Sequence, residues 1–213
     1  MEGMQAARSA DFAIGQFKYL RKLLLVHGSW SYQRISQAIL YSFYKNIALY
    51  MTQFWYVFQN GFRGLSIVES WTLTFYNVIF TVFPPFVLGV FDQFISARLL
   101  DRYPQLYQLG QSSRFFNVRI FWGWVLNGFY HSAIIYVCTS FFYRYGAALG
   151  DGLQADHWVW GTALYTATVL TVLGKAALIS NLWTKFTLLA IPGSFILWIG
   201  LFPAYAVIAP LIN

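Results

Sequence analysis

The stretch ISQAILYSFYKNIALYMTQFWYVF, residues 35–58, places a lysine near the middle of a run that is otherwise long and apolar enough to cross a bilayer. About 20 mainly apolar residues span the hydrocarbon core as a helix. A lysine at the centre of such a helix costs about 2.5–3.5 kcal/mol on insertion scales. Lys45 therefore indicates a membrane helix whose charge has a partner or a task.

The whole chain has the composition of a membrane protein. Its 213 residues are 58% hydrophobic, 21% aromatic and only 10% charged, whereas about 25% of the residues of soluble domains are charged. The net charge of +7 comes from basic residues that flank apolar runs, which is typical of membrane topology signals and not of a nucleic-acid surface. Cys138 is the one cysteine, so the sequence predicts no intrachain disulfide and no metal site.

Five apolar runs are each long enough to span a bilayer, which predicts an all-α polytopic membrane protein with five transmembrane helices. They cover 35–58, 71–91, 120–143, 158–179 and 186–203. The preceding segment is more polar, and QFKYLRKLLLV (16–26) has the spacing of a short amphipathic helix. We expect Gly28 and Ser29 to interrupt that helix. The expected organisation is a cytosolic segment, 1–33, and a transmembrane domain, 34–213.

The distribution of Lys and Arg predicts the orientation in the membrane. Eleven of the 14 lie before the first span, in the 92–119 loop or beside the fourth span, and two lie in the other loops. The N-terminus and the 92–119 loop are therefore expected in the cytosol. With five spans, the C-terminus is expected on the luminal or extracellular side.

The first span has a polar stripe along one helical face. Lys45 lies about ten residues, or roughly 15 Å, from the predicted cytosolic end, which is too far for its side chain to reach the interface. The stripe therefore favours an intramembrane site or a structural polar network. Its members and the two residues that border it are Gln37, Tyr41, Ser42, Lys45, Thr52, Tyr56, Asn46 and Gln53.

The second span combines Asn77 with the double proline Pro84–Pro85. Proline has no N–H group, so the carbonyls of Phe80 and Thr81 lose their helical partners. In lipid such carbonyls need protein, water or a ligand. Broken helices near the midplane are a device of transporters. The pattern favours a transport pathway over a simple packing kink.

The five predicted spans contain no Asp or Glu unless Asp92, at the end of the second, is counted. A pathway with one cation, amides, hydroxyls and free carbonyls suits an anionic or zwitterionic group, such as a lipid headgroup or a small anion, better than a metal ion. In the fourth span, Gly161 and Gly174 are interpreted as close-packing positions.

Two further groups of polar residues are weaker candidates. Asn127 and His131 are spaced for an interhelical hydrogen-bond pair in the third span. A candidate site for anionic or phosphoinositide headgroups lies at the predicted cytosolic span ends, although interfacial anchoring also explains it: Arg119, Lys175, Trp183 and Lys185. The sequence has no nucleotide-binding loop, no nucleophile with a base and no paired catalytic carboxylates, so no catalytic residue is assigned.

Long segments of the chain resemble the C-terminal part of lipid-flipping P-type ATPases, and they are most similar to the fungal late-Golgi aminophospholipid flippases. The resemblance covers essentially the whole sequence. It is carried by YSFYKNIALYMTQFWY, ESWTLTFYNVIFTVFPPF, GVFDQF, RYPQLYQLGQ, FFNVRIFWGWVLNGFYHS and LGKAALISNLWTKFTLLAIPGS.

The resemblance implies that residues 1–27 end a phosphorylation domain and that the five spans correspond to the family's fifth to ninth membrane helices. Lys45 and Asn46 match the family's YKN motif near the lipid path, and Asn77, Pro84 and Pro85 match its sixth helix. The implied activity is ATP-driven movement of an aminophospholipid, with phosphatidylserine expected, to the cytosolic leaflet. The implied membrane is that of the Golgi, the endosome or the cell surface.

The resemblance also implies what is missing from this chain. ATP and Mg²⁺ would be bound by a preceding part of the pump, which carries the phosphorylated aspartate, and a two-span accessory subunit would be a partner. We expect the chain to be a fragment that is inactive alone. Three other interpretations stay open: a related pump for cations or polyamines, a non-catalytic membrane scaffold or regulator, and an anion channel or carrier.

Overall fold

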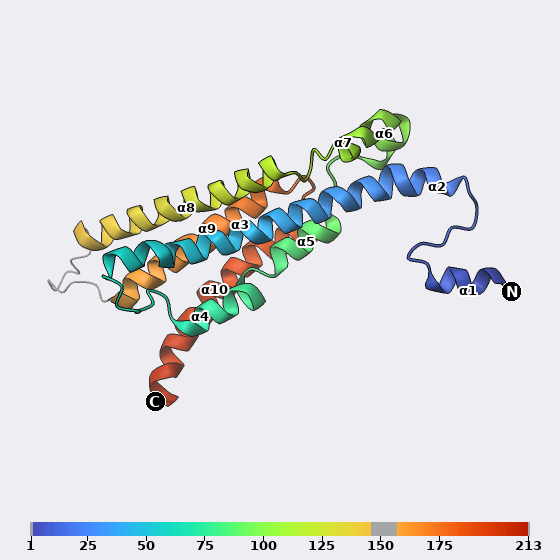
Figure 1. Cartoon of the computed structure of the whole chain (residues 1–213). Coiled ribbons are helices and arrows are strands. Elements are labelled where there is room, and N and C mark those ends of the chain that lie inside the picture. The colour runs from blue at the N-terminus through green and yellow to red at the C-terminus, as the bar shows by residue number, and fades with distance from the viewer. Residues whose placement is uncertain (1, 146–156, 213) are drawn as a thin grey trace.

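The computed structural model describes residues 2–145 and 157–212, and within these ranges every regular element is helical. This confirms the predicted all-α class. The bundle consists of long helices that run side by side, and short helices gather at the end where the chain enters it (Figure 1). Helix α1 (Glu2–Ser9) lies apart from the bundle.

A single continuous rod carries the predicted first span. It comprises α2 (Tyr19–Lys22), the π-helical turn η1 (Leu23–Gly28) and α3 (Ser29–Gln59). The expected interruption at Gly28 and Ser29 is therefore wrong, because Gly28 keeps right-handed helical angles, φ −62° and ψ −44°. A mid-helix glycine costs about 1 kcal/mol relative to alanine, and residues on both sides of Gly28, Arg21 and Trp30, bond to the 92–117 segment.

The second predicted span is a broken helix. It consists of α4 (Ser70–Phe75), the π-helical turn η2 (Tyr76–Phe80) and α5 (Phe83–Phe91). Residues 81–82 between them belong to no helix, and Thr81 has non-helical angles, φ −132° and ψ 17°. The prolines of FPPF stand in the first turn of α5, where their missing N–H groups break no bond of that helix. The break that the double proline predicted is therefore present, just upstream of it.

Three long helices complete the bundle: α8 (Val118–Tyr145), α9 (His157–Ile179) and α10 (Lys185–Ile212). The first two contain the predicted spans 120–143 and 158–179. Helix α10 continues through Pro203, beyond the predicted end of the last span. Proline is tolerated in membrane helices, where neighbouring groups and local adjustments satisfy the freed carbonyl.

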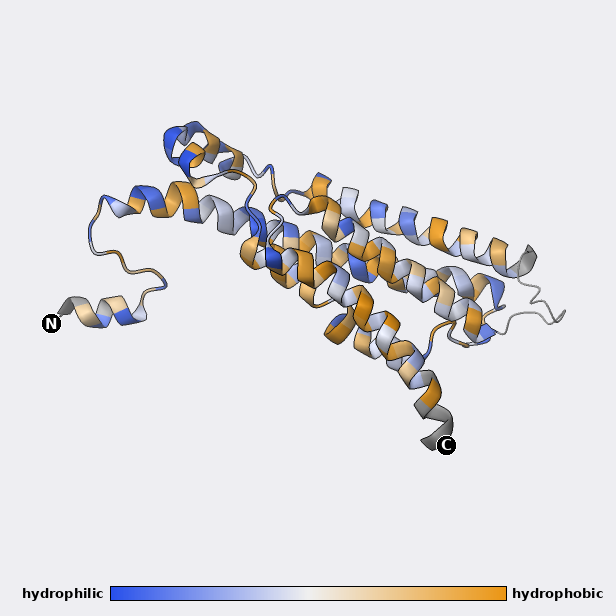
Figure 2. Ribbon diagram, turned by 180° about the vertical axis from the view of Figure 1, so that it is seen from behind, coloured by the Kyte–Doolittle hydropathy of each residue, from blue (hydrophilic) through white to orange (hydrophobic). Residues whose placement is uncertain are grey.

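Four segments of the described chain are long and apolar enough to cross a membrane: Ser70–Phe91, Val118–Tyr143, His157–Ile179 and Lys185–Tyr205. Helix α3 is longer than any of them but is not among them, because tyrosines, amides and Lys45 lower its mean hydropathy. The protein is thus a multi-pass membrane protein. The first predicted span, 35–58 in α3, stays a prediction. Figure 2 shows the apolar residues along the bundle and the hydrophilic ones around α6 (Ala97–Arg102) and α7 (Gln108–Gln111).

Helix α3 is central to the packing and contacts α5, α8 and α9, while α10 contacts α5 and α9. Three buried tyrosines join the helices. Each hydroxyl donates to a backbone carbonyl of another segment: Tyr41 to Val172 at 3.1 Å, Tyr76 to Lys45 at 2.9 Å and Tyr165 to Thr72 at 3.0 Å. Such bonds satisfy polar groups that lipid would leave unpaired.

The two glycines of α9 differ in their surroundings. A Cβ on Gly161 would lie 1.9 Å from the carbonyl oxygen of Ile67, in the loop before α4. A Cβ on Gly174 would have nothing within 4 Å. Close packing is therefore confirmed for Gly161, although against a loop, and it is wrong for Gly174.

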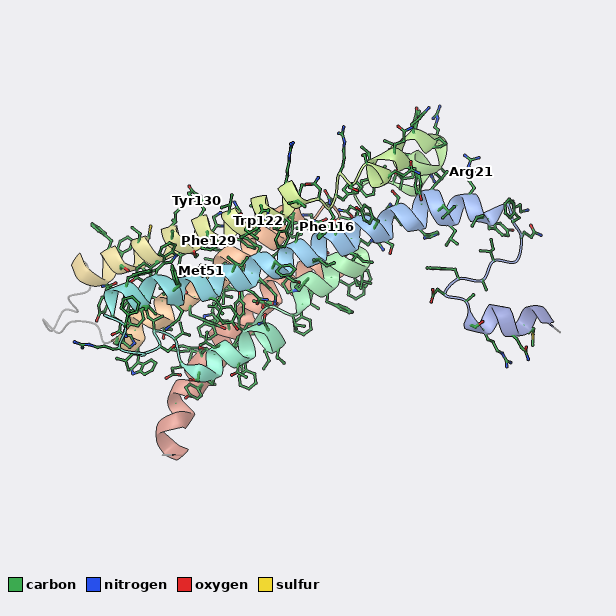
Figure 3. The ribbon with its side chains drawn as sticks, viewed as in Figure 1. Arg21, Met51, Phe116, Trp122, Phe129 and Tyr130 are labelled. Carbon is green, nitrogen blue, oxygen red and sulfur yellow. The ribbon has the colours of Figure 1, made fainter. Side chains whose placement is uncertain are left out.

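The 92–117 segment braces the rod from outside the bundle. The guanidinium of Arg21 pairs with the Asp101 carboxylate at 3.3 Å and donates to its carbonyl at 2.7 Å, and the indole of Trp30 donates to the Ile95 carbonyl at 2.8 Å. Figure 3 shows Arg21 beside α6. The two basic segments that the charge pattern assigned to one side of the membrane thus contact each other.

Asp92, at the end of α5, connects three parts of this end of the bundle. Its side chain is 2% exposed, and its carboxylate accepts from the backbone N–H groups of Asn181 and Leu182, both at 2.8 Å, and from the Asn181 amide at 2.9 Å. Arg34 of α3 donates to the Asp92 carbonyl. The turn between α9 and α10 is therefore fastened to the end of the broken helix.

Candidate functional site

Lys45 lies on the face of α3 that meets the break between η2 and α5. The residue is 5% exposed. Its Nζ donates to Asn77 Oδ1 at 2.8 Å, to Thr81 Oγ1 at 2.9 Å and to the Thr81 carbonyl at 3.3 Å. An ammonium group has three N–H donors, so all three are matched by protein acceptors.

The sequence explains why an acceptor is available at this point. The N–H that would have bonded the Thr81 carbonyl in a regular helix belongs to position 85, which is proline. The structure gives that freed carbonyl to Lys45. The expectation that the double proline would leave a carbonyl for another group is confirmed, and the group is the lysine of the first span.

Thr81 and Tyr76 close the network into a ring, which we call the lysine ring: Lys45, Tyr76, Asn77 and Thr81. The Thr81 hydroxyl donates to the Tyr76 carbonyl at 2.6 Å, and the Tyr76 hydroxyl donates to the Lys45 carbonyl at 2.9 Å. The Tyr76 ring also lies 5.6 Å from Lys45 Nζ, within cation–π range. Tyr76 and Thr81 are both fully buried.

Other residues of the predicted path lie outside the lysine ring. Tyr41 bonds to α9, and Thr52 Oγ1 donates to the Leu49 carbonyl of its own helix at 2.6 Å. Ser42 is half-buried. Asn46 Oδ1 is enclosed and has no hydrogen-bond partner. Pro84 and Pro85 begin α5 and act by freeing carbonyls upstream.

The lysine ring has no carboxylate in it. Within the described residues, the salt bridge that the structure contains is Arg21–Asp101, far along the rod from Lys45, and no cluster of His, Cys, Asp or Glu there could hold a metal ion. The ammonium charge is thus solvated by neutral oxygens alone. A site of this kind attracts a negative group and repels a metal cation.

The four predicted headgroup residues have different surroundings. Arg119, Trp183 and Lys185 are exposed. Lys175 is half-buried, and its Nζ lies 5.0 Å from the Trp124 ring and 5.7 Å from the Tyr44 ring. Among the described residues no hydrogen bond or ion pair joins the four, so their common role stays a prediction.

The expected interhelical bond of His131 is confirmed, because its Nδ1 pairs with the hydroxyl of Tyr44 on α3. Asn127, its predicted companion, has an enclosed Oδ1 without a partner.

Sequence reasoning missed two members of the lysine ring. Thr81 entered only through its carbonyl, and Tyr76 was taken as part of an apolar run. One signal was available, since Asn77 and Thr81 are four residues apart and share a helical face. The role of Asp92 as a fastening point was also missed, because its partners are about 90 residues away in sequence.

The fold and the lysine ring define a polytopic helical membrane protein with a broken helix facing a buried cation. The family model described as the phospholipid-translocating P-type ATPase C-terminal region matches residues 7–212. The chain therefore belongs to this family, and it corresponds to the C-terminal membrane part of its members.

Named relatives agree with this assignment. Phospholipid-transporting ATPase DRS2 of Saccharomyces cerevisiae is 70% identical over 100% of this chain and 16% of its own length. A phospholipid-transporting ATPase of Schizosaccharomyces pombe is 63% identical over 100% of this chain and 17% of its own length. Human phospholipid-transporting ATPase VB is 40% identical over 92% of this chain and 13% of its own length. The chain thus spans less than a fifth of the length of these relatives.

Proposed function

We propose that this chain is the C-terminal transmembrane part of an ATP-driven pump that moves a phospholipid between leaflets. The expected cargo is an aminophospholipid, phosphatidylserine, and the expected direction is from the luminal or exoplasmic leaflet to the cytosolic one. The observation that carries the proposal is the buried ammonium of Lys45, which is held by neutral oxygens at a helix break. A phosphate group supplies the negative charge that this place lacks.

The lipid path in this proposal runs along the interface of α3 with the η2–α5 break. Lys45, Asn77 and the carbonyls freed by Pro84 and Pro85 face the headgroup, and Asn46, with its unpartnered Oδ1, borders the path. Tyr41, Ser42 and Thr52 support the helix that carries the lysine. The acyl chains stay in the surrounding lipid.

The remaining parts of the proposal follow the family. Five spans place the N-terminus and residues 92–119 in the cytosol and the C-terminus on the luminal or extracellular side of a Golgi, endosomal or plasma membrane. Residues 1–33 connect to the phosphorylation domain, where ATP and Mg²⁺ act, and a two-span accessory subunit accompanies the pump. Arg119, Lys175, Trp183 and Lys185 form a second, regulatory headgroup site at the cytosolic face.

The test uses a chimera in which these 213 residues replace the matching segment of the S. cerevisiae relative. Lys45→Met is expected to abolish the acceleration of phosphoenzyme decay by phosphatidylserine, while phosphorylation by ATP persists. Lys22→Met, an exposed lysine of the rod, serves as the matched control and is expected to behave like the parent. Full lipid-stimulated turnover in Lys45→Met would sink the proposal.

A further inference from the structure

The lysine ring is saturated, and this bears on how a headgroup could use Lys45. The three Nζ donors are matched by three acceptors, two of which belong to Thr81. The residue is 5% exposed. A phosphate oxygen can therefore bond to Nζ only if one of the present acceptors leaves it.

We propose that Thr81 is a latch that competes with the lipid phosphate for Lys45, so that the headgroup engages the lysine by displacing Thr81. This inference rests on the proposed function and adds a residue that regulates the same site. Thr81 is a positioning residue in this scheme, because it acts on the lipid through Lys45. In the latched arrangement all three N–H donors of the ammonium are bonded to Asn77 and Thr81. In the released arrangement Thr81 has left, and the ammonium can bond an anion.

Three observations favour Thr81 over Asn77 as the acceptor that leaves. Asn77 lies within η2, whereas Thr81 lies at its end with φ −132° and ψ 17°, outside helical geometry. The bond from Nζ to the Thr81 carbonyl is the longest of the three, at 3.3 Å against 2.8 Å to Asn77. Release of residues 81–82 also affects only bonds at helix ends, from the Thr81 N–H to the Tyr76 carbonyl at 3.0 Å and from the Phe86 N–H to the Val82 carbonyl at 3.4 Å.

The Thr81 hydroxyl couples the latch to the helix break. It accepts from Lys45 and donates to the Tyr76 carbonyl, which also receives the Thr81 N–H at 3.0 Å. Loss of this one oxygen removes the shorter of the two bonds from Lys45 to Thr81, at 2.9 Å, and one of the two bonds that hold residue 81 against η2. The side chain therefore offers a single-atom test of the proposal.

The experiment measures the phosphatidylserine dependence of ATPase activity for Thr81→Val in the same chimera, with the lipid in mixed micelles. Valine keeps the shape and the carbonyl but removes the hydroxyl, the closer of the two competing oxygens, so the KM for phosphatidylserine is expected to fall about fivefold, the size of one net hydrogen bond. Thr81→Ser retains the hydroxyl and is expected to keep the parent KM. If Thr81→Val does not assemble, Thr81→Ala carries the same expectation.

Thr168→Val is the matched control. Thr168 is also fully buried, but its hydroxyl donates to the Leu164 carbonyl of its own helix at 2.9 Å. A KM for the Thr81 variant equal to or above that of the Thr168 control, with Lys45→Met inactive, would overturn the latch and leave the proposed function standing. Full activity of Lys45→Met would instead overturn the proposed function.

Discussion

Substitution of Asp92 tests directly what holds the α9–α10 turn to the end of α5. Asp92→Ala removes the carboxylate that receives two backbone N–H groups and one amide, all within 2.9 Å, from the α9–α10 turn. The Arg34 bond is kept, because it goes to the Asp92 carbonyl. The variant thus isolates the side chain.

The expected loss follows from the donors left behind. A hydrogen bond to a charged group contributes about 1.5–3 kcal/mol, and a buried donor without an acceptor costs about 1–3 kcal/mol. Because the three bonds share one carboxylate, they are not additive, and we expect a loss of about 3–5 kcal/mol in the free energy of unfolding. For a chain of this size that lowers Tm by roughly 6–20 °C. Asp92→Asn keeps one acceptor oxygen and should lose about half as much.

The assay is thermal unfolding of the purified chain in detergent, followed by circular dichroism. Asp101→Ala is the matched control, since Asp101 pairs with Arg21 at a side-chain exposure of 52%, and exposed pairs contribute about 0–1 kcal/mol. If Asp92→Ala unfolds within about 3 °C of Asp101→Ala, the turn is not held by the carboxylate and the reasoning is refuted.

Two further predictions concern packing and the tyrosine bonds. Gly161→Ala should lower the unfolding free energy by about 1–3 kcal/mol, because the new methyl overlaps the Ile67 carbonyl oxygen; Gly174→Ala on the same helix should be neutral or stabilising, and equal effects would contradict the close contact. Tyr41→Phe should cost about 0.5–1.5 kcal/mol through its lost bond to the Val172 carbonyl. Tyr130→Phe, 62% exposed and labelled on α8 in Figure 3, should cost nothing measurable, and a matching loss there would exclude the bond as the cause.

The fold class and four of the span positions followed from the sequence because hydropathy over about 20 residues is a local property. The end of α10 did not, since Pro203 reads locally as a stop. Whether a helix continues through proline is decided by its neighbours in lipid. Gly28 also reads locally as a stop, yet the rod continues through it between Arg21 and Trp30, which both contact the 92–117 segment.

The residues of the candidate site were also only partly predictable from the sequence. Lys45 and the double proline are visible in sequence because a buried charge and a missing N–H are exceptional in a membrane helix. Thr81 and Tyr76 are ordinary residues there, and only the orientation of η2 against α3 gives them roles. From the sequence, Asp92 is an acid at the end of a predicted span. Its bonds to the α9–α10 turn could not be predicted, because that turn is 89 residues away in sequence.

The brace on the rod makes it a two-armed lever. Trp30, bonded to Ile95, divides the rod into an outer arm back to Tyr19 of about 16 Å and an inner arm to Lys45 of about 22 Å, at 1.5 Å per residue. With the pivot at the brace, a sideways push of about 2 Å on the outer tip would swing the lysine by nearly 3 Å in the opposite sense. That travel is as long as the 2.8 Å bond to Asn77. A rigid rod would thus carry a movement at Tyr19 to the lysine ring, against the bonds of Arg21 to Asp101 on the outer arm and of Arg34 to Asp92 on the inner arm.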